Sequence, residues 1–126
     1  KCLCSKETRE YDGLCAPFYY REKVIDAIHR YKFRDERAIG EFFAKNMAQR
    51  IKYCFSDKTF HMIVPVPLYK KKLRERGYNQ SMLLAKGIGK LINVPVFSIL
   101  SKDFDTKPQH LTDASKRAGN VAGFSA

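Results

Sequence analysis

Five cations gathered in one short stretch are the strongest chemical signal in this sequence. Residues 70–76 contain three lysines and two arginines, followed by a glycine and by an asparagine that can cap a helix. Arginine grips phosphate through paired N–H donors, lysine acts as a point charge, and a helix N-terminus adds backbone N–H groups. The sequence predicts a phosphate or pyrophosphate site in a basic loop, 70–80, with a solvated basic loop as the alternative. The predicted ligands are Lys71, Lys72, Arg74, Arg76, Gly77, Asn79 and Gln80.

Cysteine is the second residue type that could do chemistry here. Cys2, Cys4 and Cys15 could supply three Zn²⁺ ligands, although one residue separates the first two where zinc fingers usually have two to four, and no fourth ligand is evident. Cys54 falls on an apolar helical stripe, which favours a small core residue. The three histidines are scattered, so no nucleophile–base pair and no catalytic residue is assigned.

The charge of the whole chain favours an anionic partner. Lys and Arg total 24 against 13 Asp and Glu, which gives a net charge of +11. Such a surface attracts nucleic acid and phosphorylated small molecules. Aromatic and basic residues alternate at 31–34 and are adjacent at 69–72, a mixture that can serve single-stranded nucleic acid or can simply reflect core aromatics beside surface charge.

Three amphipathic segments and two apolar runs must position these residues. Helical spacing of apolar side chains predicts helices at 21–31, 36–54 and 80–92, the last capped by Asn79. A further short helix is predicted at 113–118. Continuous apolar runs predict two strands, at 60–68 and 94–100. Such runs are typical of strands that are covered on both faces, as in a parallel sheet.

The order helix, helix, strand, helix, strand predicts an α/β domain. Ligands of open α/β sheets bind beyond the carboxyl ends of the strands, and the first predicted strand ends where the cations begin. Two strands are too few for a stable open sheet, so either further strands are missing or a partner chain, such as a second copy in a homo-oligomer, completes the sheet.

Nothing in the sequence predicts a membrane span or a secretory leader. No apolar run reaches the roughly 18–20 residues of a membrane helix, and residues 1–7 lack the apolar core of a signal peptide. A cytoplasmic setting is therefore expected. The chain does not start with methionine, which is consistent with a start inside a longer protein.

The central motif resembles the ComF family. Residues 63–68 (IVPVPL) and 74–80 (RERGYNQ) resemble the family's VPVPL strand and RxRGxNQ segment. Residues 16–20 and 31–34 resemble its apfxY and KfxgD stretches, and residues of its C-terminal motif follow in order at Gln109, Leu111, Arg117, Asn120 and Phe124. The resemblance extends over nearly the whole chain.

This resemblance implies a fold, ligands and partners. It implies a partial type I phosphoribosyltransferase domain, with a Rossmann-like parallel sheet, at 16–126, and the remnant of a cysteine-rich, zinc-finger-like segment at 1–15. The predicted site at 70–80 would correspond to the pyrophosphate loop, which binds phosphoribosyl pyrophosphate together with Mg²⁺. Family members are linked to natural competence, the uptake of DNA for transformation.

Two departures from the family pattern leave the function open. The paired Cys-x-x-Cys motifs of the family's zinc module are absent, and the acidic pair followed by Thr-Thr-Gly, which holds the ribose 5-phosphate, does not occur before Ala126. A complete phosphoribosyltransferase site therefore cannot be built from these residues alone. The alternative to a phosphoribosyltransferase-type protein is a non-catalytic module that binds single-stranded DNA or a competence helicase.

Overall fold

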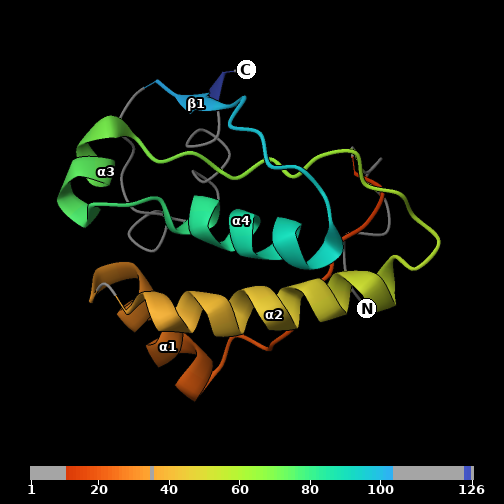
Figure 1. Ribbon diagram of the computed structural model, residues 1–126. Coiled ribbons are helices and arrows are strands. Elements are labelled where there is room, and N and C mark those ends of the chain that lie inside the picture. Colours follow the sequence, from red (N-terminus) through yellow and green to blue (C-terminus); the bar gives the residue numbers. More distant parts are fainter. Residues whose placement is uncertain (1–10, 35, 104–123, 126) are drawn as a thin grey trace, which may run out of the picture.

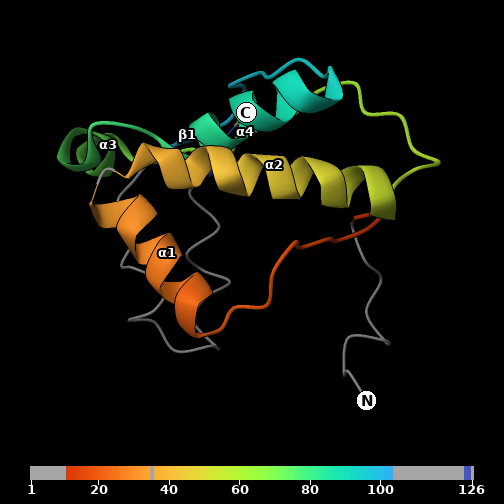
Figure 2. The ribbon, with the colours of Figure 1, turned by 60° about the horizontal axis from the view of Figure 1, so that its bottom comes forward.

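The fold is a small set of helices that pack around one central helix pair. The computed structural model describes residues 11–34, 36–103 and 124–125. Helices α2 and α4 lie side by side and run in the same direction, α1 crosses α2, and α3 precedes α4 at its N-terminal end (Figures 1 and 2). The elements are α1 (Glu22–Phe33), α2 (Arg37–Cys54), α3 (Lys70–Arg76), α4 (Gln80–Ile92), β1 (Ser101–Lys102) and β2 (Phe124–Ser125).

The three helices expected from apolar periodicity are confirmed to within two residues at each end. Helix α4 also has the predicted cap, because the Asn79 side-chain oxygen accepts hydrogen bonds from the backbone N–H of Ser81 at 2.9 Å and of Met82 at 3.3 Å. The Asn79 side-chain nitrogen donates to the carbonyl of Val66 at 3.2 Å. Asn79 therefore ties the start of α4 to the extended segment before α3.

Replacing Asn79 with alanine should lower the free energy of unfolding by about 1 kcal/mol, because two N–H groups of the first turn lose their acceptor. Asn79→Ser is the matched control, since a hydroxyl keeps the cap and, like alanine, lacks the amide donor that reaches the Val66 carbonyl. Urea denaturation of both variants measures the difference. Equal stability of the alanine and serine variants would contradict the capping role.

The core has two buried clusters. One joins the C-terminal end of α1, the middle of α2 and the turn before α4, and the other lies between α2 and α4. A Cβ atom added at Gly87 would lie 2.7 Å from the Ala44 Cβ, so the two helices approach closely because position 87 has no side chain. The buried residues are Tyr31, Phe43 and Tyr78 in the first cluster, and Ala44, Ala48 and Ile88 in the second.

The two predicted strands are reduced to one parallel bridge. Ile63 pairs with Val96: the Ile63 N–H donates to the Pro95 carbonyl at 2.8 Å, and the Phe97 N–H donates to the Ile63 carbonyl at 3.0 Å. Prolines within both segments remove N–H donors, which shortens the ladder. The prediction of strands over 60–68 and 94–100 is therefore wrong in extent. The connectivity, two parallel extended segments joined through α3 and α4, is that of a reduced β-α-β unit.

The basic segment is a helix rather than the predicted loop. Residues 70–76 are lysine, leucine, arginine and glutamate, all good helix formers, and they form α3. Gly77 ends α3 in the left-handed conformation, with φ 75°, and its N–H donates to the Leu73 carbonyl. Glycine adopts this conformation without strain, so its role here is to stop α3 and turn the chain toward α4.

The end of the described chain holds the shortest elements. β1 and β2 pair antiparallel, with Ser101 opposite Ser125. The helix predicted at 113–118 lies outside the described residues, as does the cysteine-rich start of the chain up to residue 10. Among the described residues, no helix is both long enough and apolar enough to span a membrane.

Candidate functional site

A pocket of about 580 Å³ forms where the C-terminal end of α1 meets α3. Four cationic side chains and one carboxylate line it, beside two aromatic rings. Because the cations come from two segments far apart in the sequence, their positive charge is concentrated by the tertiary fold. We call this the cationic pocket; its lining residues are Lys32, Phe33, Arg34, Lys72, Glu75, Arg76 and Tyr78.

Hydrogen bonds tie the C-terminal end of α1 to residues 78–80, which directly follow α3. The Tyr31 hydroxyl donates to the Gln80 carbonyl at 2.9 Å, and the Tyr78 hydroxyl donates to the Tyr31 carbonyl. Burial, followed by the influence of Tyr78, raises the pKa of Tyr31 to about 12, so this hydroxyl keeps its proton at neutral pH. The Gln80 side-chain nitrogen adds a bond to the Lys32 carbonyl at 3.3 Å. The end of α1 is therefore held against the turn between α3 and α4.

Arg76 is held in place on two sides. One guanidinium nitrogen donates to the Gln80 side-chain oxygen at 3.3 Å, and the guanidinium carbon lies 5.0 Å from the centre of the Phe33 ring. A guanidinium carries five N–H donors, so a single bond to Gln80 leaves donors that can reach a ligand. Arg76 is thus held in place in the cationic pocket with N–H donors left over.

Lys32 lies in surroundings that disfavour its positive charge. Lys32 as a whole residue is exposed, but its ammonium group is partly buried, and that desolvation, together with the charge of Arg76, lowers its pKa. Both causes disfavour the charged form. An anion bound between Lys32 and Arg76 would offset both the repulsion between the two cations and the cost of desolvating the Lys32 ammonium group.

The lowered pKa of Lys32 makes a pH-dependent prediction. Between that pKa and the ordinary value of 10.5, the unfolded chain binds more protons than the folded protein, so stability rises with pH. At neutral pH, Lys32→Met should be more stable than the unsubstituted protein, and this advantage should shrink as the pH rises toward 10.5. Urea denaturation at a series of pH values measures it. Lys71→Met removes an exposed lysine and so controls for the change in net charge. A stability difference between Lys32→Met and the unsubstituted protein that stays the same at every pH would contradict a lowered Lys32 pKa.

The structure divides the predicted phosphate ligands. Lys72 and Arg76 line the cationic pocket, whereas Lys71 and Arg74 are exposed and do not line it. Helical geometry explains this division, because positions 72, 75 and 76 share one face of α3. Gly77 ends the helix and Asn79 caps the next one, as described above, while Gln80 is buried. Their intramolecular bonds build the cationic pocket, and their role as direct phosphate ligands stays a prediction.

Two cations of the pocket were not among the predicted ligands. Lys32 and Arg34 come from the stretch whose alternating aromatic and basic residues stood out in the sequence. That alternation was the available signal. Tyr31 packs in the core and Phe33 lies against Arg76, while Lys32 and Arg34, which alternate with them in the sequence, line the cationic pocket. Sequence spacing alone could not pair this stretch with α3.

The donor set of the cationic pocket suits an anion better than a bare metal ion. Glu75 is the one carboxylate that lines it, among four cations. Mg²⁺ usually binds through one or two carboxylates together with substrate phosphates. The residues therefore fit Mg²⁺ that arrives on a pyrophosphate, with Glu75 as the only carboxylate of the lining that could face it.

One cysteine lies in surroundings that differ from the predicted ones. The Cys15 thiol is half-buried beside Cys54, and burial, then the neighbouring Cys54 thiol, raises the pKa of Cys15. Cys54 is exposed, so the prediction that it is a core residue is wrong. It lies at the end of α2, beyond Ile51 and Ile92, which pack against the core. Cys2 and Cys4 lie outside the described residues, so the Zn²⁺ site stays a prediction.

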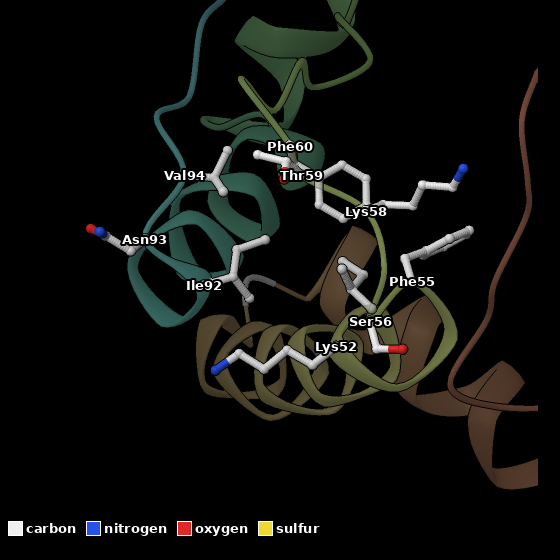
Figure 3. Close-up of a pocket in the computed structure, with 10 residues that line it drawn as sticks. Lys52, Phe55, Ser56, Lys58, Thr59, Phe60, Ile92, Asn93 and Val94 are labelled. Carbon is white, nitrogen blue, oxygen red and sulfur yellow. The ribbon is translucent and has the colours of Figure 1, made fainter.

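A further pocket of about 430 Å³ lies between the C-terminal ends of α2 and α4. It contains two lysines, Lys52 and Lys58, beside the apolar side chains of Phe60 and Ile92. The two ammonium groups point away from each other in opposite directions (Figure 3). These lysines do not converge on one anion, in contrast to the cations of the cationic pocket.

Two curated proteins are similar to the chain. It is 29% identical over 82 residues to competence protein ComFC of Bacillus subtilis, and this alignment covers 65% of this chain and 34% of that protein. It is 27% identical over 122 residues to competence protein F of Haemophilus influenzae, and this alignment covers 94% of this chain and 53% of that protein. The chain thus spans between a third and about half the length of these relatives.

No protein-family model and no solved structure matches the chain. The two similar proteins nevertheless agree with each other in name, and the longer alignment includes nearly all of the chain. They also agree with the motif resemblance centred on residues 63–80. These similarities support the assignment of the chain to the ComF family.

Proposed function

We propose that this chain binds the pyrophosphate group of phosphoribosyl pyrophosphate, or of a related phosphate ligand, in its cationic pocket. The single observation that carries the proposal is that Lys32, Arg34, Lys72 and Arg76 line one pocket. The names of the two relatives support a role in competence.

The chemistry of the cationic pocket matches a polyphosphate. Charge-assisted hydrogen bonds from guanidinium groups are short and directional, and a pyrophosphate offers several acceptor oxygens within the reach of four cations. In phosphoribosyl transfer the pyrophosphate is the leaving group, so cations that hold it would stabilise the charge that develops on it. Phosphoribosyl transfer by the whole protein, within an α/β fold of the phosphoribosyltransferase type, belongs to the same proposal.

Isothermal calorimetry with pyrophosphate and with phosphoribosyl pyrophosphate, each with and without Mg²⁺, tests the proposal. The expected result is saturable binding at one site per chain for both ligands, with Mg²⁺ strengthening it. Sulfate at the same ionic strength controls for general attraction to a basic protein. Binding that fails to saturate, or that sulfate reproduces, would overturn the proposal.

A second candidate function, binding of single-stranded nucleic acid, rests on exposed aromatic rings with arginines over them. Tyr19 is 84% exposed with Arg21 at 5.8 Å from its ring, and Tyr53 is 77% exposed with Arg50 at 5.5 Å. Bases can stack on such rings while the arginines attract the backbone.

Fluorescence anisotropy of a labelled oligonucleotide at several salt concentrations tests this second function. Its affinity should fall steeply with salt, and Tyr53→Ala should weaken it. Pyrophosphate should compete poorly, because these rings do not line the cationic pocket. Complete competition by pyrophosphate would place the nucleic acid in the cationic pocket instead.

A further inference from the structure

A second pocket adjoins the cationic pocket and has the opposite character. It has a volume of about 330 Å³ and lies between residues 16–20, α1, α2 and the start of α4. We call it the apolar pocket, because most of its wall is aromatic or aliphatic, including Phe18, Tyr20, Ile28, Phe43 and Leu84. Its volume lies within the range of sites that hold small molecules, roughly 300–1,000 Å³.

The aromatic part of its wall is held in place by the core. The Phe18 and Phe43 rings lie 5.9 Å apart at 56°, and Tyr31 meets Phe43 edge to face at 6.1 Å. Phe18 also stacks on Phe42 at 5.8 Å. Rings fixed in this way present flat apolar surfaces to a ligand without a large loss of side-chain entropy on binding.

The two pockets share one wall. Lys32 lines both of them, and the Gln80 side chain, which lines the apolar pocket, bonds to the Lys32 carbonyl on one side and to Arg76 on the other. A ligand anchored by phosphate near Arg76 therefore has the apolar pocket beside it, across Lys32. Ser81 adds a hydroxyl to the apolar wall close to this boundary.

We propose that the two pockets form one composite site for a phosphate ester that carries a planar aromatic ring, a ligand of the nucleoside phosphate class. The phosphate occupies the cationic pocket, and the ring packs among Phe18, Tyr20 and Phe43, where Gln80 and Ser81 can meet its polar edge. The phosphate end of this inference rests on the function proposed above, whereas the ring end rests on the apolar pocket.

Affinities of adenosine 5′-monophosphate and ribose 5-phosphate, compared on the same protein, test the inference. The nucleotide should bind about tenfold more tightly or better, because stacking of its base adds to the phosphate contacts. Ile28→Phe, which fills the apolar pocket, should reduce the nucleotide to the affinity of ribose 5-phosphate and leave ribose 5-phosphate unchanged. Ile28→Val is the matched control, which keeps that pocket open.

A measurement on the unsubstituted protein covers the case in which Ile28→Phe does not fold. The nucleotide should shift the methyl NMR signals of Met47 and Leu84, which line the apolar pocket, and ribose 5-phosphate should not. Equal affinities of the two ligands with no methyl shifts would overturn the composite site and leave the proposed function standing. If pyrophosphate also fails to bind, the proposed function fails with it.

Discussion

Pyrophosphate affinity is expected to fall about 10- to 100-fold when Arg76 is replaced by alanine, since a hydrogen bond between charged groups contributes about 1.5–3 kcal/mol. Arg76 is the cation of the pocket that Gln80 and Phe33 hold in position, so its donors are already oriented before the ligand arrives. Arg76→Lys keeps the charge but loses the planar fork, and its affinity should fall between the two. Calorimetric titration of each variant measures these changes.

Arg74→Ala is the matched control for this loss. It removes the same charge from the same helix, but Arg74 is exposed and does not line the cationic pocket. Its affinity should stay within about threefold of the unsubstituted protein, because attraction by an exposed charge is screened by salt. If both arginine variants lose affinity equally, pyrophosphate binds to the general charge of α3, and the cationic pocket is not the site.

Tyr31→Ala should lower the free energy of unfolding by about 3–5 kcal/mol, the usual cost of truncating a buried aromatic side chain. Tyr31 is 3% exposed, and its ring fills the space over Gly40, where an added Cβ would lie 2.8 Å from it. Since small domains have only about 5–15 kcal/mol of stability in total, this variant should be partly unfolded at physiological temperature. Thermal and urea denaturation measure the loss.

Tyr31→Phe separates the ring from its hydroxyl. This variant keeps the packing and loses the bond to the Gln80 carbonyl, so it should cost only about 1–2 kcal/mol. It should also loosen the lock between the end of α1 and the start of α4, which positions Lys32 beside Arg76. A phenylalanine variant as unstable as the alanine variant would show that the hydrogen bond, rather than the packing, dominates.

Most of the helical structure could be predicted from the sequence. Apolar residues at helical spacing predicted α1, α2 and α4, because an amphipathic helix must bury one face wherever it packs. Asn79 predicted the start of α4 for a local reason, since its side chain reaches the N–H groups of the next turn. The cluster of cations in residues 70–76 likewise predicted an anionic ligand from composition alone.

Other features depend on neighbours that the sequence does not identify. Residues 60–68 and 94–100 are apolar like buried strands, yet a strand needs a partner along its length, and the prolines leave one bridge. Cys54 continues the apolar stripe of α2 but lies beyond the partner helix, so it is exposed. Gly77, one of the predicted phosphate ligands, also ends α3 in the left-handed conformation, a role that becomes visible only with the helix before it.

The sequence by itself determined which charges this protein carries and which segments form its main helices, because charge and helical periodicity are local properties. Only the tertiary structure decided which cations act together. It placed Lys32 and Arg34 beside Lys72 and Arg76 and left Lys71 and Arg74 on the surface, since a helix presents one face to a neighbour. The hydrogen bonds of Tyr31, Tyr78 and Gln80 determine which segment that neighbour is.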